Sequence, residues 1–243
     1  MIQLGVQLMG KTIGIIQPGK LGDIIICLPI AKYWADKGYK VVWPIFRNFE
    51  PMFKEVIEYV EFIPITSNVY TCIFDAYDAL VNKYICDKIF DIAATFPGSK
   101  CTDEYVNLGD GFGPEKFDEF KYRKTEVPFD LKWKLQYNRN LEKENEVYNL
   151  YVKEERYDVV STKHSRGNLD VTFDSKNQII ALNENHNIFH WVKVLENAQT
   201  IALVDSAPAN LVEQLNISCK KIVLRKPGHP IPTFRNKWII KEV

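Results

Sequence analysis

The segment from residue 11 to residue 29 constrains the fold more than any other stretch of this chain. It begins with a short apolar run, Thr12–Ile16, whose β-branched residues suit a strand that is buried on both faces. The next three residues, Gln-Pro-Gly, predict a turn, because proline cannot donate to a sheet ladder and glycine tolerates positive φ. A second apolar run, Ile24–Trp34, has helical spacing. The segment therefore predicts a strand, a loop and a helix, the first βα unit of a nucleotide-binding α/β domain.

The predicted loop has the chemistry of an anion site. Gly19 and Gly22 let the backbone approach a ligand closely, and the N–H groups at the start of the helix favour a negative charge. Lys20 and Asp23 add one charge of each sign, and a carboxylate near a helix N-terminus is stabilised. Two interpretations of Asp23 stay open, a helix cap and a general base at the edge of a cleft.

Residues 15–29 read Ile-Ile-Gln-Pro-Gly-Lys-Leu-Gly-Asp-Ile-Ile-Ile-Cys-Leu-Pro. This resembles the N-terminal signature of glycosyltransferase family 9, the ADP-heptose:lipopolysaccharide heptosyltransferases and their relatives. That signature is a strand, a Pro-small-small-Leu-Gly-Asp loop and an apolar helix start with Leu-Pro, and Lys20 stands where serine is common. The resemblance implies that Asp23 is the catalytic base and that Gly19, Lys20 and Gly22 shape the acceptor side and the approach to the phosphates.

Predicted strands alternate with predicted helices along the rest of the chain, which implies right-handed crossovers and parallel sheets. The resemblance implies an α/β fold of the GT-B type, with two Rossmann-like domains facing a cleft and the second domain reduced. We expect an acceptor-side domain over residues 10–150 and a nucleotide-sugar domain over residues 155–243. Between the predicted elements, 100–114 reads as an irregular loop and 141–153 as a charged, solvated connector helix.

A second strand–turn–helix pattern begins at residue 201, Ile-Ala-Leu-Val-Asp-Ser-Ala-Pro-Ala-Asn-Leu. Ser206 suits the N-cap and Pro208 the first helical turn, so the helix start predicts another anion site. The pattern looks like the family's strand-Asp-Thr/Ser-Gly-x-x-His element, which meets the donor diphosphate. Here Ala207 replaces the glycine and Asn210 stands near the histidine. The resemblance implies that Asp205, Ser206 and Ala207 lie on the donor side, with Asp205 as an orienting or capping residue.

Further donor-side candidates follow the predicted strands of the second half. Lys163 or Arg166 could supply the cation that stabilises a leaving diphosphate, and Glu184 could accept a hydrogen bond from a ribose hydroxyl. Each of these three also fits an ordinary solvated surface residue. The four histidines are scattered and an Asp-x-Asp pair is lacking, so we expect metal-independent chemistry and no cofactor besides the nucleotide sugar.

Composition limits the partners. Lys and Arg together number 31, as do Asp and Glu, and this balance argues against non-specific binding of nucleic acid. The five cysteines form no Cys-x-x-Cys pair, which favours a reducing compartment. No apolar run approaches the roughly 20 residues of a membrane span, and residues 1–10 make a poor signal peptide. We expect a cytoplasmic protein that meets membranes only through a lipid-linked acceptor.

The sequence thus favours a transferase that moves a sugar from a nucleotide-diphosphate sugar to a glycan or lipopolysaccharide-type acceptor. Two alternatives stay open. The changes at Ala207 and Asn210 and the short chain are compatible with a non-catalytic relative that binds a nucleotide or a glycan. An NAD-dependent Rossmann enzyme is the weaker alternative, because the loop at 17–22 lacks one glycine of Gly-x-Gly-x-x-Gly and the second predicted strand ends at Pro44 instead of an acid.

Overall fold

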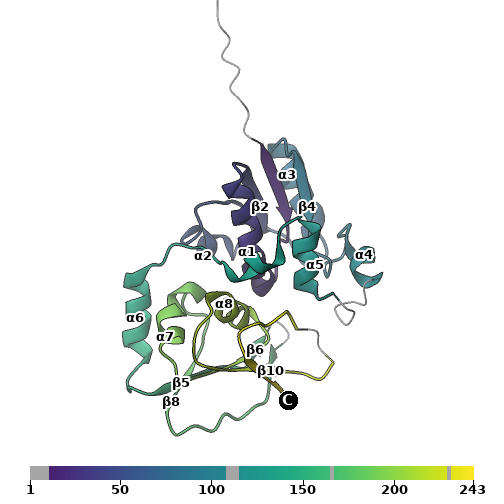
Figure 1. Cartoon of the computed structure of the whole chain (residues 1–243). Coiled ribbons are helices and arrows are strands. Elements are labelled where there is room, and N and C mark those ends of the chain that lie inside the picture. The colour runs from purple at the N-terminus through teal and green to yellow at the C-terminus, as the bar shows by residue number, and fades with distance from the viewer. Residues whose placement is uncertain (1–10, 108–114, 165–166, 229–230) are drawn as a thin grey trace, which may run out of the picture.

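The computed structural model describes residues 11–107, 115–164, 167–228 and 231–243, and it confirms the α/β prediction. The chain forms two halves, each built on a parallel sheet (Figure 1). The first sheet has the order β3-β2-β1-β4, with β1 Thr12–Ile16, β2 Lys40–Phe46, β3 Glu61–Ile65 and β4 Lys88–Asp91. The second has the order β11-β10-β9-β5-β8, with β5 Tyr157–Ser161, β8 Gln178–Ala181, β9 Thr200–Val204, β10 Lys220–Arg225 and β11 Trp238–Glu242. A short antiparallel pair joins β6 (Lys163–His164) and β7 (Gly167–Asn168).

Helices cover both faces of the first sheet. Along β1, Ile13 and Ile15 pack into the core beneath α1 (Leu21–Asp36), α2 (Glu50–Lys54) and α5 (Phe117–Lys124), whereas Ile16 packs with α3 (Cys72–Lys83). Successive side chains of a strand point to opposite faces of the sheet. Because helices cover both faces here, apolar side chains suit both faces of the strand.

Among the described residues, the helices that pack on the second sheet lie on one face of it. Its core packs against α6 (Leu141–Tyr151), η2 (Ile188–Trp191), α7 (Val192–Glu196) and α8 (Ala207–Leu215). The opposite face is covered by the segment around residues 169–173, above an apolar cavity of about 270 Å³. The second half is therefore reduced in helices and not in strands.

One local expectation differs from the structure. A helix, α4 (Thr102–Asn107), lies where a loop was predicted, and Thr102 Oγ1 anchors it by donating to the carbonyl of Ala94 at 3.1 Å. The part of the predicted glycine-rich loop at 108–114 lies outside the described residues.

The helix α6 is more than a solvated connector. Glu144 and Val147 are buried, and Val147 belongs to the core of the second half. Arg139, just before α6, pairs with Glu144 and with Glu196 of α7, so the charged face of the helix is tied down as well. The structure groups α6 with the second sheet, although the expected domain range placed it in the first. The domain limits at 150 and 155 stay a prediction.

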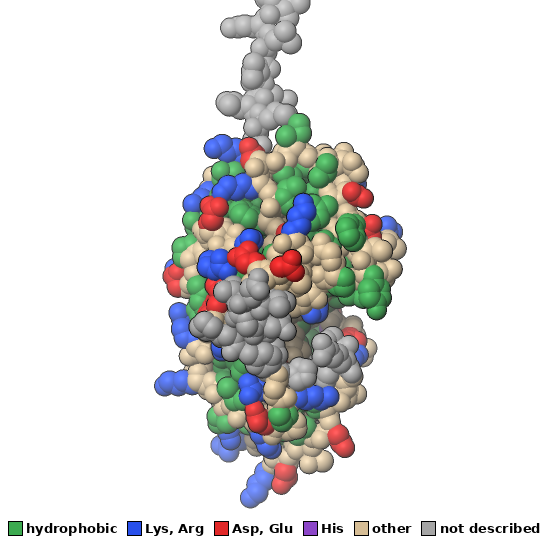
Figure 2. Space-filling view, turned by 90° about the vertical axis from the view of Figure 1, so that its right-hand side faces the viewer, with side chains coloured by type: hydrophobic (Ala, Val, Ile, Leu, Met, Phe, Trp, Pro, Cys, Tyr) green, Lys and Arg blue, Asp and Glu red, His purple; other side chains and the backbone are tan. Residues whose placement is uncertain are grey.

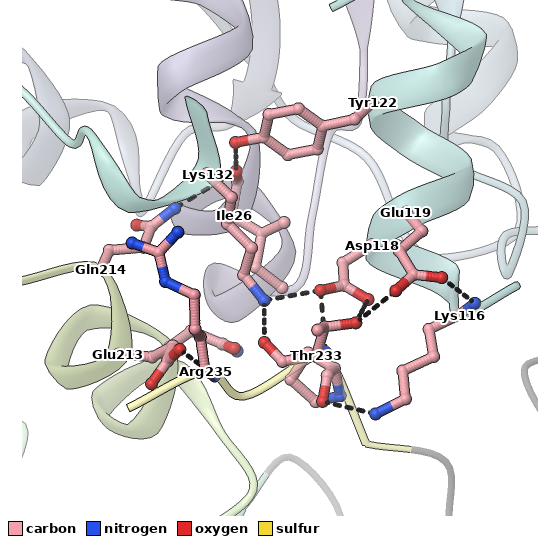
Figure 3. A network of polar contacts seen from close by, with 12 residues as sticks. Ile26, Lys116, Asp118, Glu119, Tyr122, Lys132, Glu213, Gln214, Thr233 and Arg235 are labelled. Atoms are coloured by element: carbon pink, nitrogen blue, oxygen red, sulfur yellow. Dashed lines mark hydrogen bonds and ion pairs between the residues drawn. The ribbon is translucent and has the colours of Figure 1, made fainter. Parts of the chain in front are cut away.

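A segment near the C-terminus returns to the first half and fixes the junction between the halves. η1 (Phe129–Trp133) contributes Lys132, whose Nζ lies 2.5 Å from Asp118 Oδ2 of α5 and donates to the carbonyl of Thr233 at 2.6 Å. The N–H of Thr233 donates to the same carboxylate at 2.9 Å. Figure 3 shows the Lys132 ammonium between these two partners, with Glu119 and Lys116 at the edge of the network.

Glu213 of α8 continues this junction. Its carboxylate accepts from the indole N–H groups of Trp133 at 2.5 Å and Trp238 at 2.7 Å, and from the N–H of Arg235 at 2.6 Å. Beside it, Gln214 donates to the carbonyl of Ile26 in α1 at 3.3 Å. Buried polar groups need such partners, so the junction is specified by many directional contacts in addition to its apolar packing.

The surface shows mixed charge. On the face drawn in Figure 2, Lys and Arg side chains are interspersed with Asp and Glu side chains. Such a face does not create the strong positive field that non-specific nucleic-acid binding uses. Among the described helices, none combines the length and the apolar character that crossing a bilayer requires.

Candidate active site between the two sheets

A pocket of about 1180 Å³ lies between the two halves. From the first half it is lined by residues that follow β1, β2 and β4, together with Ile26 and Phe117; from the second half, mainly by residues at or beyond the ends of β5, β8, β9 and β10. In parallel sheets, ligands bind beyond the carboxyl ends of the strands. The two sheets present these ends to one shared space, which is the cleft that the sequence predicts.

The starts of α1 and α8 meet in this pocket. A Cβ added to Gly22 would lie 2.9 Å from Asn210 Nδ2 and 3.3 Å from the backbone nitrogen of Ala207. Gly22 therefore permits a close approach between the two helix starts. Lys20, with φ of 58°, and Ser206 are the N-caps, and neither side chain makes a capping hydrogen bond. The expected Ser206 cap is wrong in this respect, because its hydroxyl donates to the carbonyl of Val204 at 3.1 Å.

Asp23 lines the pocket in the first turn of α1, with 16% of its side chain exposed. Its Oδ1 lies 3.4 Å from Nζ of Lys121, a lysine of α5. Because Lys20 occupies the N-cap, the capping interpretation of Asp23 is wrong. The carboxylate is instead held at the wall of a cleft, where a general base needs to be.

Asp205 faces Asp23 from the end of β9. Burial, and then the negative charges of Asp23 and Asp118, raise the pKa of Asp205 to about 7, against the opposing charges of Lys132 and Arg225. Asp205 does not cap α8. Besides Glu184, the pocket thus holds the carboxyl groups of Asp23 and Asp205, and Asp205 exchanges its proton near neutral pH.

Of the other two loop residues, Lys20 lines the pocket and Gly19 does not. Lys20 lines the pocket, and its Nζ donates to Thr95 Oγ1 at 2.8 Å. Gly19 is buried and does not line the pocket: a Cβ there would lie 2.3 Å from the ring of Phe46. Gly19 therefore serves packing, because it leaves room for the ring of Phe46, and Phe46 itself lines the pocket.

Lys163 and Glu184 also line the pocket, and they pair with each other. Lys163 Nζ lies 2.7 Å from Glu184 Oε2, and both side chains are exposed. Lys163, the predicted cation, and Glu184, the predicted partner of the ribose, thus form one surface ion pair. A ligand would have to separate the two side chains or bind to both. Arg166, the alternative cation, lies outside the described residues.

Sequence reasoning missed two cations at the end of β10. Arg225 and Lys226 line the pocket, and Arg225 Nη2 lies 2.5 Å from Glu242 Oε1. The buried Nε of Arg225 has no hydrogen-bond partner among the described residues. Arg225 is the last residue of β10, and Lys226 follows it. Lys163 was chosen as a candidate because it follows a predicted strand, and the same criterion also selects Arg225 and Lys226.

An aromatic recess at the end of β8 was missed as well. Trp191 lines the pocket, and its ring centroid lies 4.7 Å from that of Tyr151. His186 Nε2 and Asn183 Nδ2 lie 3.3 Å and 3.0 Å from the Tyr151 hydroxyl. In the described part of the chain, the buried Trp191 Nε1 has no partner. The recess combines flat rings with polar edges.

Comparison with solved structures identifies the same architecture elsewhere. A glycosyl transferase family 9 structure from Veillonella parvula superposes with a TM-score of 0.61 at 10% identity, over 96% of this chain and 86% of that one. The ADP-heptose lps heptosyltransferase II of E. coli gives 0.51 at 12% identity, over 96% and 90%. TibC, a dodecameric iron-containing glycosyltransferase of enterotoxigenic E. coli, gives 0.53 at 8% identity, over 96% and 64%.

No protein-family model and no curated protein matches the sequence. The identities to the solved structures are low, so the likeness concerns the fold. The two parallel sheets, the shared pocket and the superpositions agree: this chain has the GT-B fold of the glycosyltransferase family 9 structures.

Proposed function

We propose that this protein is a glycosyltransferase that moves a sugar from a nucleotide-diphosphate sugar to a glycan or lipopolysaccharide-type acceptor. One observation carries the proposal: Asp23 and the start of α8 line the same pocket from opposite sheets. A carboxylate faces a helix N-terminus there, which places a base for an acceptor hydroxyl opposite a site for a diphosphate.

The donor belongs on the side of the second sheet. The start of α8, from Ser206 onward, suits the diphosphate, and Arg225, Lys226 and Lys163 line the same pocket as possible cationic partners. The polar edge of the aromatic recess suits a nucleobase, because His186 and Asn183 line the pocket and can hydrogen-bond to the edge of a base. Cationic side chains and helix amides can stabilise the leaving group, so the proposal stays metal-independent and needs no other cofactor.

The acceptor belongs on the side of the first sheet. Lys20 and Thr95 supply polar contacts, and Phe46, Phe49 and Met52 form an apolar wall. In the proposed step the acceptor oxygen bonds to the anomeric carbon while the bond from that carbon to the diphosphate oxygen breaks. The hydroxyl proton passes to Asp23, and the electron pair leaves with the nucleoside diphosphate. We place this reaction in the cytoplasm.

The non-catalytic alternative draws on a specific observation. Lys163 and Glu184 neutralise each other at the donor side, and Ala207 and Asn210 depart from the family's pattern. A protein that binds a nucleotide without transferring a sugar would share the pocket but release no nucleoside diphosphate. Binding and turnover therefore have to be measured separately.

The binding half of the proposal is tested with a ligand panel. We expect one of ADP, UDP, GDP and CDP to raise the melting temperature and to give a measurable heat of binding, with NAD giving neither. Lys226→Met should weaken that binding several-fold, while Lys176→Met, which removes an exposed charge outside the pocket, should leave it unchanged. Stabilisation by NAD alone would overturn the proposal.

Sugar transfer is tested with nucleotide sugars that carry the same nucleoside diphosphate as the one that binds. Each is incubated with lipopolysaccharide of truncated core, and release of the nucleoside diphosphate is followed together with the mass of the glycan. Release of the nucleoside diphosphate that requires the acceptor supports sugar transfer. Binding without any release across the donors and acceptors would favour the non-catalytic alternative.

Asp205 predicts a pH dependence of diphosphate binding. Its folded pKa of about 7 exceeds the ordinary carboxyl value, so the neutral form prevails below about pH 7 and the carboxylate above it. A carboxylate beside the start of α8 repels a diphosphate. We expect binding to weaken roughly threefold to tenfold between about pH 6 and about pH 8, beyond any change seen in Asp205→Asn. Calorimetry on both proteins measures the difference, and equal pH dependence would contradict it.

The same shift affects stability with a defined sign. Between the unfolded and the folded pKa of Asp205, the folded state holds a proton that the unfolded chain has released. The contribution of Asp205 to the free energy of unfolding is therefore largest below about pH 4 and falls as the pH rises through about 7. Asp205→Asn should remove this part of the pH dependence.

A further inference from the structure

Lys121 is a buried lysine that the proposed chemistry does not use directly. Only 5% of its side chain is exposed, and it does not line the pocket. Its Nζ donates to Gln17 Oε1 at 2.5 Å and to the carbonyl of Ile92 at 2.7 Å, and lies 3.4 Å from Asp23 Oδ1. A buried ammonium is costly unless it is paired and hydrogen-bonded, and this one has two hydrogen bonds and one ion-pair contact.

We infer that Lys121 is a positioning residue, which holds the Asp23 carboxylate ionised and oriented at the wall of the pocket. The inference rests on the proposed role of Asp23 as the base. Lys121 touches neither sugar nor nucleotide in this scheme, so it acts through Asp23 alone. By engaging Oδ1, the ammonium holds the carboxylate of a residue that lines the pocket.

The two other partners of the ammonium are themselves fixed. Gln17 follows β1 and is buried; its Nε2 donates to the carbonyl of Gly19 at 2.9 Å, and its own carbonyl accepts from the Trp43 indole at 3.1 Å. Ile92 follows β4, and its N–H donates to the carbonyl of Ile16 at 3.1 Å. The ammonium is thus located by the ends of two neighbouring strands, and its place does not depend on Asp23.

The helix that carries Lys121 is joined to the helix that carries Asp23. Next to Lys121, the Tyr122 hydroxyl donates to the carbonyl of Ile26 in α1 at 2.9 Å. The Trp34 indole of α1 donates to the carbonyl of Thr125, just after α5, at 3.3 Å. These buried contacts hold α5 against α1, and they set the distance between the two charges.

Asp23 shares the pocket with a second carboxyl group, Asp205, which follows β9, and the charge of Asp23 acts on Asp205. The paired charges of Asp118 and Lys132 act on Asp205 and on Cys27 with opposite signs, so their effects partly cancel. The neighbouring thiol of Cys27 is neutral, because burial raises its pKa to about 12. A bound diphosphate adds further negative charge. Within the described residues, Lys121 is the one cation in ion-pair contact with Asp23.

The test begins with a measurement that needs no turnover. In protein labelled with ¹³C at the aspartate carboxyls, the Asp23 resonance is the one that Asp23→Asn removes. We expect its titration midpoint to rise by about one pH unit or more in Lys121→Gln, which keeps a donor for Ile92 but removes the charge. Lys121→Arg should restore most of the parent midpoint. Lys124→Met, which removes a half-exposed lysine from the same helix, is the matched control and should leave it unchanged.

Turnover adds the second readout. In Lys121→Gln the acid limb of the pH–rate profile should move upward by the same amount, and kcat should fall at least tenfold at neutral pH, while nucleoside diphosphate binding is retained. If Lys121→Gln does not fold, Lys121→Met replaces it in both measurements. An unchanged Asp23 midpoint in a folded variant overturns the inference, whether or not the parent transfers sugar. A parent that binds no nucleotide overturns the proposed function and leaves the midpoint test valid.

Discussion

Asp23→Asn is expected to lower sugar transfer by about 10²- to 10⁴-fold while the protein still binds the nucleoside diphosphate. Asparagine has the size of aspartate and cannot accept the proton of the acceptor hydroxyl, so the loss falls on the chemical step. Asp23 lies opposite the start of α8 and not on it, so the donor contacts remain. The measurements are kcat from the release of nucleoside diphosphate and the dissociation constant from calorimetry.

A matched control lies on the same helix. Asp36 ends α1, is 59% exposed and pairs with Lys32 on the surface, so Asp36→Asn removes the same charge far along the helix from the pocket. It should leave kcat, binding and melting temperature close to the parent values. If Asp23→Asn transfers sugar at the parent rate, Asp23 is not the base. If it also abolishes nucleotide binding, its role is in holding the donor.

The N-terminal βα unit was predictable because its determinants are local. The strand Thr12–Ile16, the turn at Pro18 and the helix beginning at Leu21 are all encoded within some 25 residues, and the structure reproduces them. The same holds for Thr200–Val204 and α8. A strand followed by a small-residue turn and an apolar helix specifies its own structure within a short segment.

The missed residues depend on contacts between distant parts of the chain. Lys121 lies in a charged stretch that reads as a surface helix, and its partners Gln17 and Ile92 are 104 and 29 residues away. No local pattern marks which lysine of such a helix turns inward. The return of the segment around Thr233 to η1 is equally non-local, with 101 residues between Lys132 and the carbonyl it binds. Burial and pairing of this kind follow from the packed fold.

The second large effect concerns that junction. Lys132→Met should lower the free energy of unfolding by about 3–5 kcal/mol, because methionine keeps the volume of the side chain but leaves the fully buried carboxylate of Asp118 without its counter-charge. The carbonyl of Thr233 loses its donor as well. Urea unfolding measures the change. Lys134→Met, two residues along and 64% exposed, should cost less than about 1 kcal/mol.

A double variant separates the unpaired charge from simple loss of packing. Asp118→Asn in the Lys132→Met background removes the buried charge, while the amide oxygen can still accept from the N–H of Thr233. If the charge causes the loss, the double variant should be more stable than Lys132→Met alone, by at least about 1 kcal/mol. Additive losses would instead assign the effect to packing around Phe129 and Trp133, whose rings Lys132 also contacts. The ion pair would then stabilise the junction only through the bulk of its two side chains.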